Sequence, residues 1–289
     1  MNKTIEYIKN ELKDCYPAGE INSMIQLIFS KVCGMSRNEQ ILHNDRKLSE
    51  NESKKITEIT ERLKQMEPLQ YILGETEFYS IPIVLNSRVL IPRPETEELV
   101  DMIIKSDYIR QKISGKRRLK ILDIGAGSGC ISIALAKHIR KADVYAADID
   151  ENSLDNILIN RNILGLSNLE PLRLDILRAA ERRRVETTFD LIVSNPPYVL
   201  DRERESMSDN VLKYEPQEAI FVPDRNPLKF YKPIADLAQK RLVSGGFLFL
   251  EINPLYCIRL IKLLQGKGLE VINVFRDLSG KRRFMTAKK

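Results

Sequence analysis

The second half of the chain contains the stretch Phe189-Asp190-Leu191-Ile192-Val193-Ser194-Asn195-Pro196-Pro197-Tyr198. Its first part is a short apolar run that includes β-branched residues, which is typical of a buried strand in a parallel sheet. Open α/β sheets bind their ligands at the carboxyl ends of such strands. We therefore predict an α/β fold with a ligand site at residues 195–198.

The chemistry of these four residues suits a planar NH2 group. The two prolines fix φ near −65° and lack N–H donors, so the turn is stiff and rich in acceptor carbonyls. The Asn195 side-chain oxygen and the Pro196 carbonyl can each accept one N–H of an amide, while Tyr198 can stack on it and Pro197 supplies stiffness. The alternative is a plain Pro-Pro turn that ends a strand, with Asn195 as its cap.

The rest of the chain divides into two parts. Apolar residues recur at helical spacing in the first 75 residues, which predicts a small helical bundle, and residues 49–53 are a polar helix start. Residues 78–85 and 88–91 predict a β-hairpin around Asn86-Ser87, within a linker that spans residues 76–94. From residue 95 to 289 strands and helices alternate, which indicates a mainly parallel sheet that ends in an antiparallel edge pair.

A glycine-rich loop follows the first strand of the alternating part. It reads Gly125-Ala126-Gly127-Ser128-Gly129 and leads into a helix, so the backbone can approach a ligand closely at a positive helix end. Asp148 follows the second strand about 20 residues later, where an acid can bind a ribose diol. These residues predict a nucleoside-containing cofactor.

The glycine spacing distinguishes between two cofactors. A nicotinamide-dinucleotide site would have its third glycine at position 130, where this chain has Cys130. The spacing instead resembles that of S-adenosylmethionine-dependent methyltransferases. Asp175 and Ile176, after the third strand, are candidates for the adenine edge and face, although Asp175 can equally cap the next helix.

Composition narrows the class of protein. With 43% hydrophobic and 30% charged residues among 289, the chain is typical of a globular protein, and its formal charge of +6 suits an acidic or nucleic-acid-associated partner. The four cysteines lie far apart, so we expect neither a metal site nor disulfides. The sequence shows no signal-peptide core and no apolar span of membrane length, and we expect a cytoplasmic protein with no membrane partner.

Several motifs together resemble the bacterial release-factor glutamine N5-methyltransferases, the HemK/PrmC family. The resemblance extends over nearly the whole chain, and its most diagnostic run is Pro92-Arg93-Pro94-Glu95-Thr96. The other matching segments are residues 67–74, 77–79, 89–91, the glycine loop, Asn195–Tyr198, Tyr214-Glu215-Pro216 and Asp277-Leu278-Ser279-Gly280.

The resemblance implies a class I methyltransferase fold, Rossmann-like, with a seven-stranded, mainly parallel sheet. It implies methyl transfer from S-adenosylmethionine, with S-adenosylhomocysteine as product, to the glutamine of the Gly-Gly-Gln motif of class 1 peptide chain release factors. Residues 1–75 would help to hold the factor, and we expect a monomer without direct nucleic-acid binding. The cofactor would contact residues 125–129, Asp148, Asp175, Ile176 and Asn195, and the glutamine would contact residues 195–198.

Two other functions stay open at this point. The same amide clamp fits a glutamine of a ribosomal protein, or the exocyclic amine of adenine in nucleic acid. A non-catalytic, cofactor-sensing binding module is a hypothesis from another class, because activity cannot be read from residue types alone.

Overall fold

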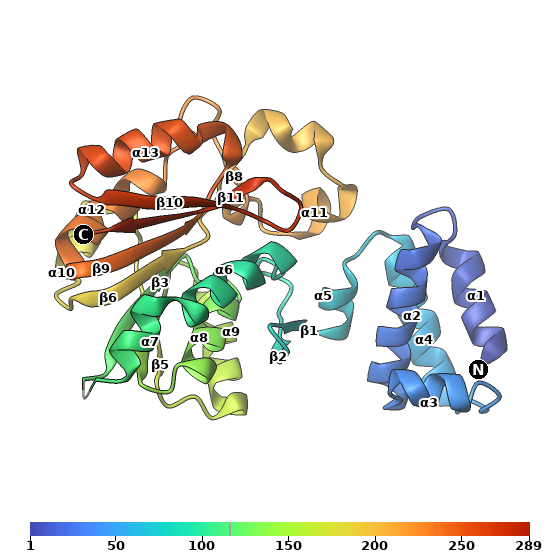
Figure 1. Cartoon of the computed structure of the whole chain (residues 1–289). Helices are drawn as coiled ribbons and strands as arrows, with labels where there is room; N and C mark the ends of the chain where they lie inside the picture. The colour runs from blue at the N-terminus through green and yellow to red at the C-terminus, as the bar shows by residue number, and fades with distance from the viewer. Residues whose placement is uncertain (116) are drawn as a thin grey trace. The chain divides into compact units, whose positions relative to one another are not determined.

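The computed structural model describes residues 1–115 and 117–289, apart from the side chain of Ile272. The chain forms two compact units, which Figure 1 traces in colour from the N- to the C-terminus. One contains Met1–Glu75 and Ser208–Tyr214, and the other contains Thr76–Met207 and Glu215–Lys289.

The first unit is a helical bundle. Its apolar stripes point inward, so that Ile8, Ile28, Phe29, Ile56 and Leu63 are fully buried. The polar start signal predicted at residues 49–53 is confirmed, because a capping box formed by Ser49 and Glu52 begins the fourth helix. The helices are α1 (Asn2–Leu12), α2 (Ala18–Cys33), α3 (Arg37–Leu42), α4 (Glu50–Lys64) and α5 (Leu69–Leu73), joined by α11 (Asp209–Tyr214).

Helix α11 is an addition that the sequence pattern did not indicate. It lies far along the chain from the other helices of the unit, and the Tyr214 hydroxyl donates to the Gln65 carbonyl over 2.8 Å. A six-residue segment is too short to show a hydrophobic period of its own, so its place depends on tertiary contacts such as this one.

The second unit is built on a seven-stranded sheet with the strand order β10-β11-β9-β6-β3-β4-β5. The central pairs β9-β6, β6-β3, β3-β4 and β4-β5 are parallel, whereas β11 pairs antiparallel with both β9 and β10. The prediction of a mainly parallel sheet with an antiparallel edge pair is confirmed. The strands are β3 (Leu119–Ile124), β4 (Ala142–Asp148), β5 (Leu169–Arg173), β6 (Phe189–Ser194), β9 (Leu242–Glu251), β10 (Glu270–Arg276) and β11 (Arg282–Lys288).

Helices cover both faces of this sheet, as Figure 1 shows. Neighbouring strand residues belong to opposite cores: Ile121 and Leu191 face one core, and Leu122 and Ile192 the other. Burial on both faces explains why these strands read as continuous apolar runs. The first core includes residues of α6 (Pro94–Lys105), α7 (Asp107–Ile113), α8 (Cys130–His138) and α9 (Glu151–Leu164), and the second includes residues of α12 (Tyr231–Arg241) and α13 (Cys257–Gly266).

The hairpin before α6 lies earlier than predicted. Its strands are β1 (Glu75–Phe78) and β2 (Ile81–Val84), so the predicted strand over residues 88–91 and the turn at Asn86-Ser87 were wrong. The chain turns instead at Tyr79-Ser80, with φ of +51° and +57°, which is the geometry that closes a two-residue hairpin. The side chain of Glu97 stabilises this turn by accepting from the Tyr79 N–H over 2.9 Å.

Several short elements complete the second unit between its strands. They follow no simple hydrophobic period, and sequence analysis did not predict them as helices or strands. They are α10 (Ala179–Arg184), β7 (Val199–Leu200), η1 (Asp201–Ser206), η2 (Gln217–Ala219), β8 (Phe221–Val222) and η3 (Pro254–Tyr256).

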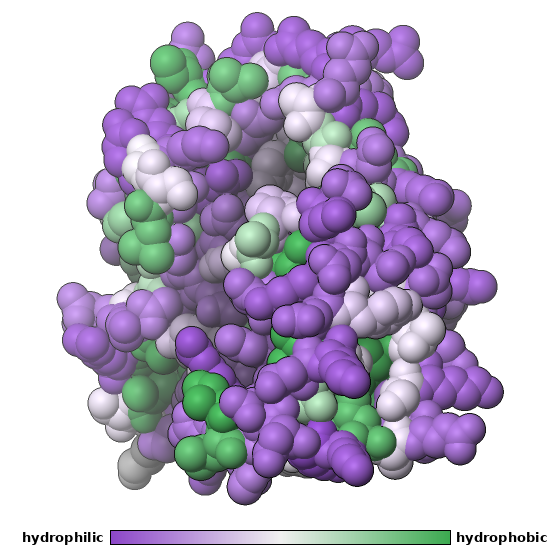
Figure 2. Space-filling view, turned by 90° about the vertical axis from the view of Figure 1, so that its right-hand side faces the viewer, coloured by the Kyte–Doolittle hydropathy of each residue, from purple (hydrophilic) through white to green (hydrophobic). Residues whose placement is uncertain are grey.

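The exposed surface is mostly polar. Figure 2 shows one face on which hydrophilic side chains predominate and hydrophobic ones form small, separate groups. Exposed large apolar residues such as Ile41, Leu42 and Leu278 are scattered along the chain, as is usual for folded proteins. Within residues 1–115 and 117–289, every helix is too short or too polar to cross a bilayer.

Candidate active site

The predicted site residues follow the carboxyl ends of four parallel strands. Strand β3 leads into the glycine loop, β4 ends at Asp148, β5 is followed by Asp175 and Ile176, and β6 is followed by Asn195. Because parallel strands end at one edge of a sheet, these residues share that edge. The Ser194 hydroxyl joins two of the strand ends directly, since it donates to the Ile124 carbonyl over 2.6 Å.

Backbone geometry requires glycine in the loop between β3 and α8. Gly125, Gly127 and Gly129 have φ of +72°, +54° and +82°, a region that residues with a Cβ rarely adopt. A Cβ on Gly129 would also lie 2.6 Å from the Ile157 side chain. The loop therefore packs closely on α9 and leads into the N-terminus of α8, where free N–H groups favour a polar ligand.

Asp148 is tied to this loop. Its Oδ2 accepts from the Gly127 N–H over 2.8 Å, and its Oδ1 accepts from the Asp150 N–H over 3.0 Å. Burial raises the pKa of the Asp148 carboxyl, while these N–H donors act in the opposite direction. Each oxygen keeps a second lone pair, so the carboxylate can still accept from the two hydroxyls of a ribose.

Asp123, near the end of β3, has an unsatisfied oxygen. The carboxyl is fully buried and accepts from the Ser132 hydroxyl at Oδ2, but Oδ1 has no hydrogen-bond partner among the described residues. Burial raises the pKa of Asp123 to about 7. Such an oxygen is costly in a folded core unless a ligand supplies the missing donor. Sequence analysis did not include Asp123 in the site.

Asp175 and Ile176 follow β5, where Asp175 is hydrogen-bonded within the turn and Ile176 packs in the core. The Asp175 carboxylate caps the turn after the strand, because Oδ1 accepts from the Leu177 N–H at 2.9 Å and Oδ2 pairs with Arg178 at 3.1 Å. Ile176 is 9% exposed and belongs to the second core, as Ile124 does. Its side chain therefore forms part of the apolar floor at this edge.

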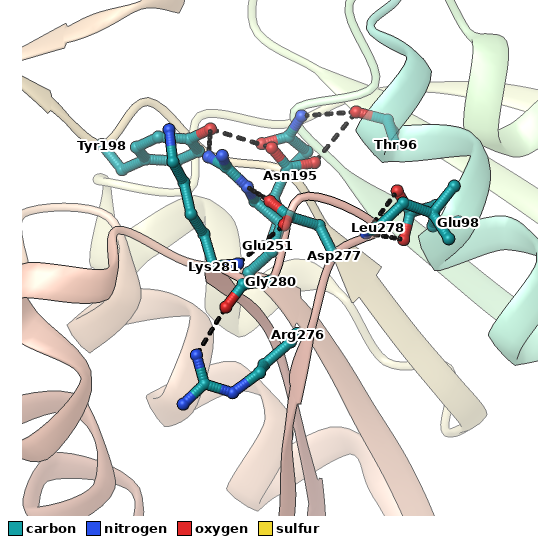
Figure 3. A network of polar contacts seen from close by, with 11 residues as sticks. Thr96, Glu98, Asn195, Tyr198, Glu251, Arg276, Asp277, Leu278, Gly280 and Lys281 are labelled. Carbon is teal, nitrogen blue, oxygen red and sulfur yellow. Dashed lines mark hydrogen bonds and ion pairs between the residues drawn. The ribbon is translucent and has the colours of Figure 1, made fainter.

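Asn195 and Tyr198 are both held through Glu251, as Figure 3 shows. Asn195 Nδ2 donates to Thr96 Oγ1 over 3.1 Å, and the Thr96 hydroxyl donates to Glu251 Oε2 over 2.9 Å. The Tyr198 hydroxyl donates to Glu251 Oε1, also over 2.9 Å. The Asn-Pro-Pro-Tyr turn is thus anchored at both ends by one carboxylate at the end of β9.

A second layer of contacts supports this carboxylate network. Arg283 Nη1 donates to the Tyr198 oxygen over 3.1 Å, and Arg283 Nε donates to Asp277 Oδ2 over 3.0 Å. The Tyr231 hydroxyl donates to the backbone oxygen of Glu251 over 2.9 Å. Burial raises the pKa of both Glu251 and Tyr198. The Tyr198 hydroxyl is therefore a neutral structural group, and only the ring is left for substrate contact.

Sequence analysis missed Thr96, Glu251 and Arg283 as parts of the site. Thr96 belongs to the Pro-Arg-Pro-Glu-Thr run, which carries the family resemblance but whose pattern does not indicate a role for Thr96 at the site. For Glu251 the signal was a charged residue at the end of an otherwise apolar strand, since buried acids are rare unless they have partners. Arg283 lies on a different strand, and its pairing depends on a strand order that the sequence leaves open.

Two other motifs that carry the resemblance meet at the start of α6. Glu215, of Tyr214-Glu215-Pro216, has a side chain that is 1% exposed and accepts from Arg93 Nη2 over 2.6 Å. It also accepts from the Ile91 N–H over 3.2 Å. This ion pair joins a buried carboxylate to a partly exposed guanidinium and fixes the entry to α6, and so it helps to place Thr96 three residues beyond Arg93.

Family models match two segments of the chain, and curated relatives match nearly all of its length. The PrmC N-terminal domain matches residues 3–74, and the methyltransferase small domain matches residues 104–214. A release factor glutamine methyltransferase of Bacteroides thetaiotaomicron is 39% identical over 100% of both chains. One of the same name from Flavobacterium psychrophilum is 38% identical over 95% of this chain and 94% of its own.

A solved structure supports the fold. The crystal structure of a methyltransferase from Pyrococcus furiosus covers 83% of this chain and 99% of its own, with a TM-score of 0.51 at 17% identity. Together with the parallel sheet and its helices, this confirms the predicted methyltransferase fold. On the full-length identity to its relatives, the chain belongs to the release factor glutamine methyltransferase family.

Proposed function

We propose that this protein transfers a methyl group from S-adenosylmethionine to the side-chain nitrogen of the glutamine in the Gly-Gly-Gln motif of class 1 release factors. The observation that carries the proposal is the fixed Asn195 amide at the end of β6. Its Nδ2 is bonded to Thr96, so Oδ1 is directed away from Thr96 and can accept from a substrate N–H.

The residues at the sheet edge fit the cofactor. Asp148 would bind the ribose hydroxyls, the loop from Gly125 to Gly129 would lie against the cofactor backbone, and Ile176 would support the adenine with Asp175 beside it. The unpartnered oxygen of Asp123 suits the ammonium group of the cofactor's amino-acid end. When bound, S-adenosylmethionine supplies an already activated methyl group.

The chain's own contribution is orientation and electrostatics. An amide nitrogen is a weak nucleophile because its lone pair is delocalised into the carbonyl. Asn195 Oδ1 and the Pro196 carbonyl would each accept one N–H of the glutamine, which fixes the nitrogen and favours the positive charge that grows on it. Pro197 stiffens the turn, and the Tyr198 ring packs on the planar group. The nitrogen becomes acidic as it gains the methyl group and can give up one N–H proton to water, so no side-chain base is needed.

We propose different roles for the two parts of the chain. Residues 1–75 would help to hold the release factor, residues 76–94 would join the units, and residues 95–289 would carry the reaction. A substrate that works on the ribosome also implies a cytoplasmic protein. We expect it to act as a monomer on the factor itself, without binding nucleic acid directly.

A methyl-transfer assay tests the acceptor. Radiolabelled S-adenosylmethionine is incubated with the protein and a purified release factor, the same factor with Gln→Ala in its Gly-Gly-Gln motif, or an adenine-rich oligonucleotide. We expect label on the wild-type factor alone. Label on the oligonucleotide would assign the clamp to adenine, and no label with cofactor still bound would favour a binding module.

Changing Asp148 to asparagine tests the cofactor site. The substitution replaces one acceptor oxygen by a donor that faces the Asp150 N–H, and it removes the charge that accepts from the ribose. We expect the Kd for S-adenosylmethionine to rise about 10- to 100-fold, as calorimetry would measure. The control is Asp143→Asn, at the exposed amino end of the same strand. Equal affinities for both variants would place the ribose elsewhere.

A further inference from the structure

One buried carboxylate controls both ends of the Asn-Pro-Pro-Tyr turn. We infer that Glu251, acting through Thr96, is a positioning residue that decides which face of the Asn195 amide meets the substrate. Glu251 is 2% exposed and Thr96 is 2% exposed, so neither is placed to contact a substrate itself. The inference rests on the proposed function and adds to it the origin of the clamp's selectivity for an NH2 group.

Figure 3 draws the network. The direction of each hydrogen bond follows from two of its groups, the Arg283 guanidinium and the Glu251 carboxylate. Arg283 can only donate, so the Tyr198 oxygen accepts from it and the single Tyr198 proton goes to Glu251. Both Glu251 oxygens lie against hydroxyls, those of Tyr198 and Thr96, and accept from them as a carboxylate does, so the single Thr96 proton also goes to Glu251. Thr96 then has only lone pairs to offer to Asn195.

Asn195 can satisfy Thr96 in one orientation only. The side-chain nitrogen, and not the oxygen, must face the Thr96 hydroxyl, because two acceptors would repel. The oxygen therefore lies on the opposite side of the amide. In the flipped orientation an NH2 would face the substrate NH2, and two donors cannot bond. Because Glu251 takes the Thr96 proton, the Asn195 nitrogen faces Thr96 and the Asn195 oxygen is left to accept from the substrate.

The cost of burying Glu251 supports this role. A carboxylate removed from water is unfavourable unless its oxygens are hydrogen-bonded. Burial raises the pKa of Glu251, and the Tyr198 and Thr96 hydroxyls together with the charge of Arg283 act against that rise and favour the carboxylate. Arg283 lies one hydroxyl away and is paired with Asp277, and the Tyr231 hydroxyl fixes the Glu251 backbone. A neutral glutamine of equal size could fill the same space. Only a carboxylate accepts at both of its terminal atoms, as the Thr96 and Tyr198 hydroxyls require here.

Three substitutions separate positioning from packing. Thr96→Val keeps the volume and removes the hydroxyl, Thr96→Ser keeps the hydroxyl, and Glu251→Gln lets the amide donate to one of its two partners. With a release factor as acceptor, we expect kcat to fall about 10- to 100-fold in Thr96→Val and Glu251→Gln, with KM for the factor within about threefold. Thr96→Ser should recover most of the rate. The matched control is Thr286→Val, at a buried threonine of β11 outside this network.

Nuclear magnetic resonance of the Asn195 side-chain amide tests the same inference without any substrate. In ¹⁵N-labelled protein, its signal is identified by its disappearance in Asn195→Asp. One of the two N–H protons should exchange slowly in the wild type and in Thr96→Ser, because it is bonded to Thr96, and quickly in Thr96→Val.

The outcomes are distinguishable. A wild-type protein that does not label the factor would contradict the proposed function, and the amide signal would then decide the inference alone. Wild-type kcat in Thr96→Val, or an Asn195 signal that this substitution leaves unchanged, would overturn the inference while the proposed function stands. If Thr286→Val lost as much rate as Thr96→Val, disturbed packing would explain the loss and the inference would be overturned.

Discussion

Replacing Asn195 with alanine should lower the rate of methyl transfer to a release factor by about 10³-fold or more, while the Kd for S-adenosylmethionine stays within about threefold of the wild-type value. The substitution removes the acceptor that orients the glutamine nitrogen and stabilises its growing charge. It leaves the Thr96–Glu251 and Tyr198–Glu251 hydrogen bonds in place, so the turn keeps its shape. Single-turnover labelling measures the rate, and calorimetry measures cofactor binding.

The control for this variant is Asn168→Ala. Asn168 is also half-buried and also uses its Nδ2, which donates to the Ala136 and Ala142 carbonyls over 3.0 Å each. It precedes β5 and thus lies at the amino edge of the sheet, opposite the site. A loss of rate in Asn168→Ala as large as that in Asn195→Ala would mean that general destabilisation, and not amide orientation, explains the result.

The fold could be predicted from the sequence wherever hydrophobic period and chain order agree. The apolar runs before Gly125 and Asn195 each became central strands, and the final pair became the antiparallel edge. The sequence did not predict the hairpin turn at Tyr79-Ser80, because both residues have positive φ there, which residues other than glycine normally avoid. Asn86-Ser87 had the better local turn signal, but tertiary contacts to α9 took its place, with Asn156 accepting from the Asn86 N–H.

The sequence could predict which residues of the candidate site lie at the strand ends, but not the hydrogen bonds that orient them. Residues at the carboxyl edge can be named from sequence because parallel strands share a direction. Their orienting partners come from elements far apart in the chain: Thr96 from α6, Glu251 from β9 and Arg283 from β11. Which of these meet depends on strand order, and here β9 lies between β6 and β11. Only the structure supplies that order.

Changing Asp123 to asparagine should have opposite effects on cofactor binding and on stability. At pH 8 we expect the Kd for S-adenosylmethionine to rise about 10- to 100-fold, because a charged acceptor for the cofactor's ammonium group is lost. Without cofactor, the melting temperature of Asp123→Asn minus that of the wild type should be larger at pH 8 than at pH 5. The exposed Asp143→Asn variant is the control for both measurements.

The sign of the stability effect follows from the pKa of the Asp123 carboxyl, which burial raises to about 7 from an ordinary value of 3.8. Between these values the folded state holds a proton that the unfolded state has released, so wild-type stability falls as the pH rises from about 4 to 7. From pH 5 to pH 8 the loss is roughly 2 to 3 kcal/mol. Asparagine does not titrate, so the variant escapes this loss.

Scanning calorimetry at pH 5 and pH 8 then measures the melting difference between Asp123→Asn and wild type, and we expect it to grow by about 5 °C. A difference that is constant with pH would show that the buried carboxyl does not titrate near 7. An unchanged cofactor Kd would mean that its free oxygen faces something other than the cofactor. The two effects have one cause: an oxygen that the fold leaves without a donor destabilises the empty protein and is available to a ligand that brings one.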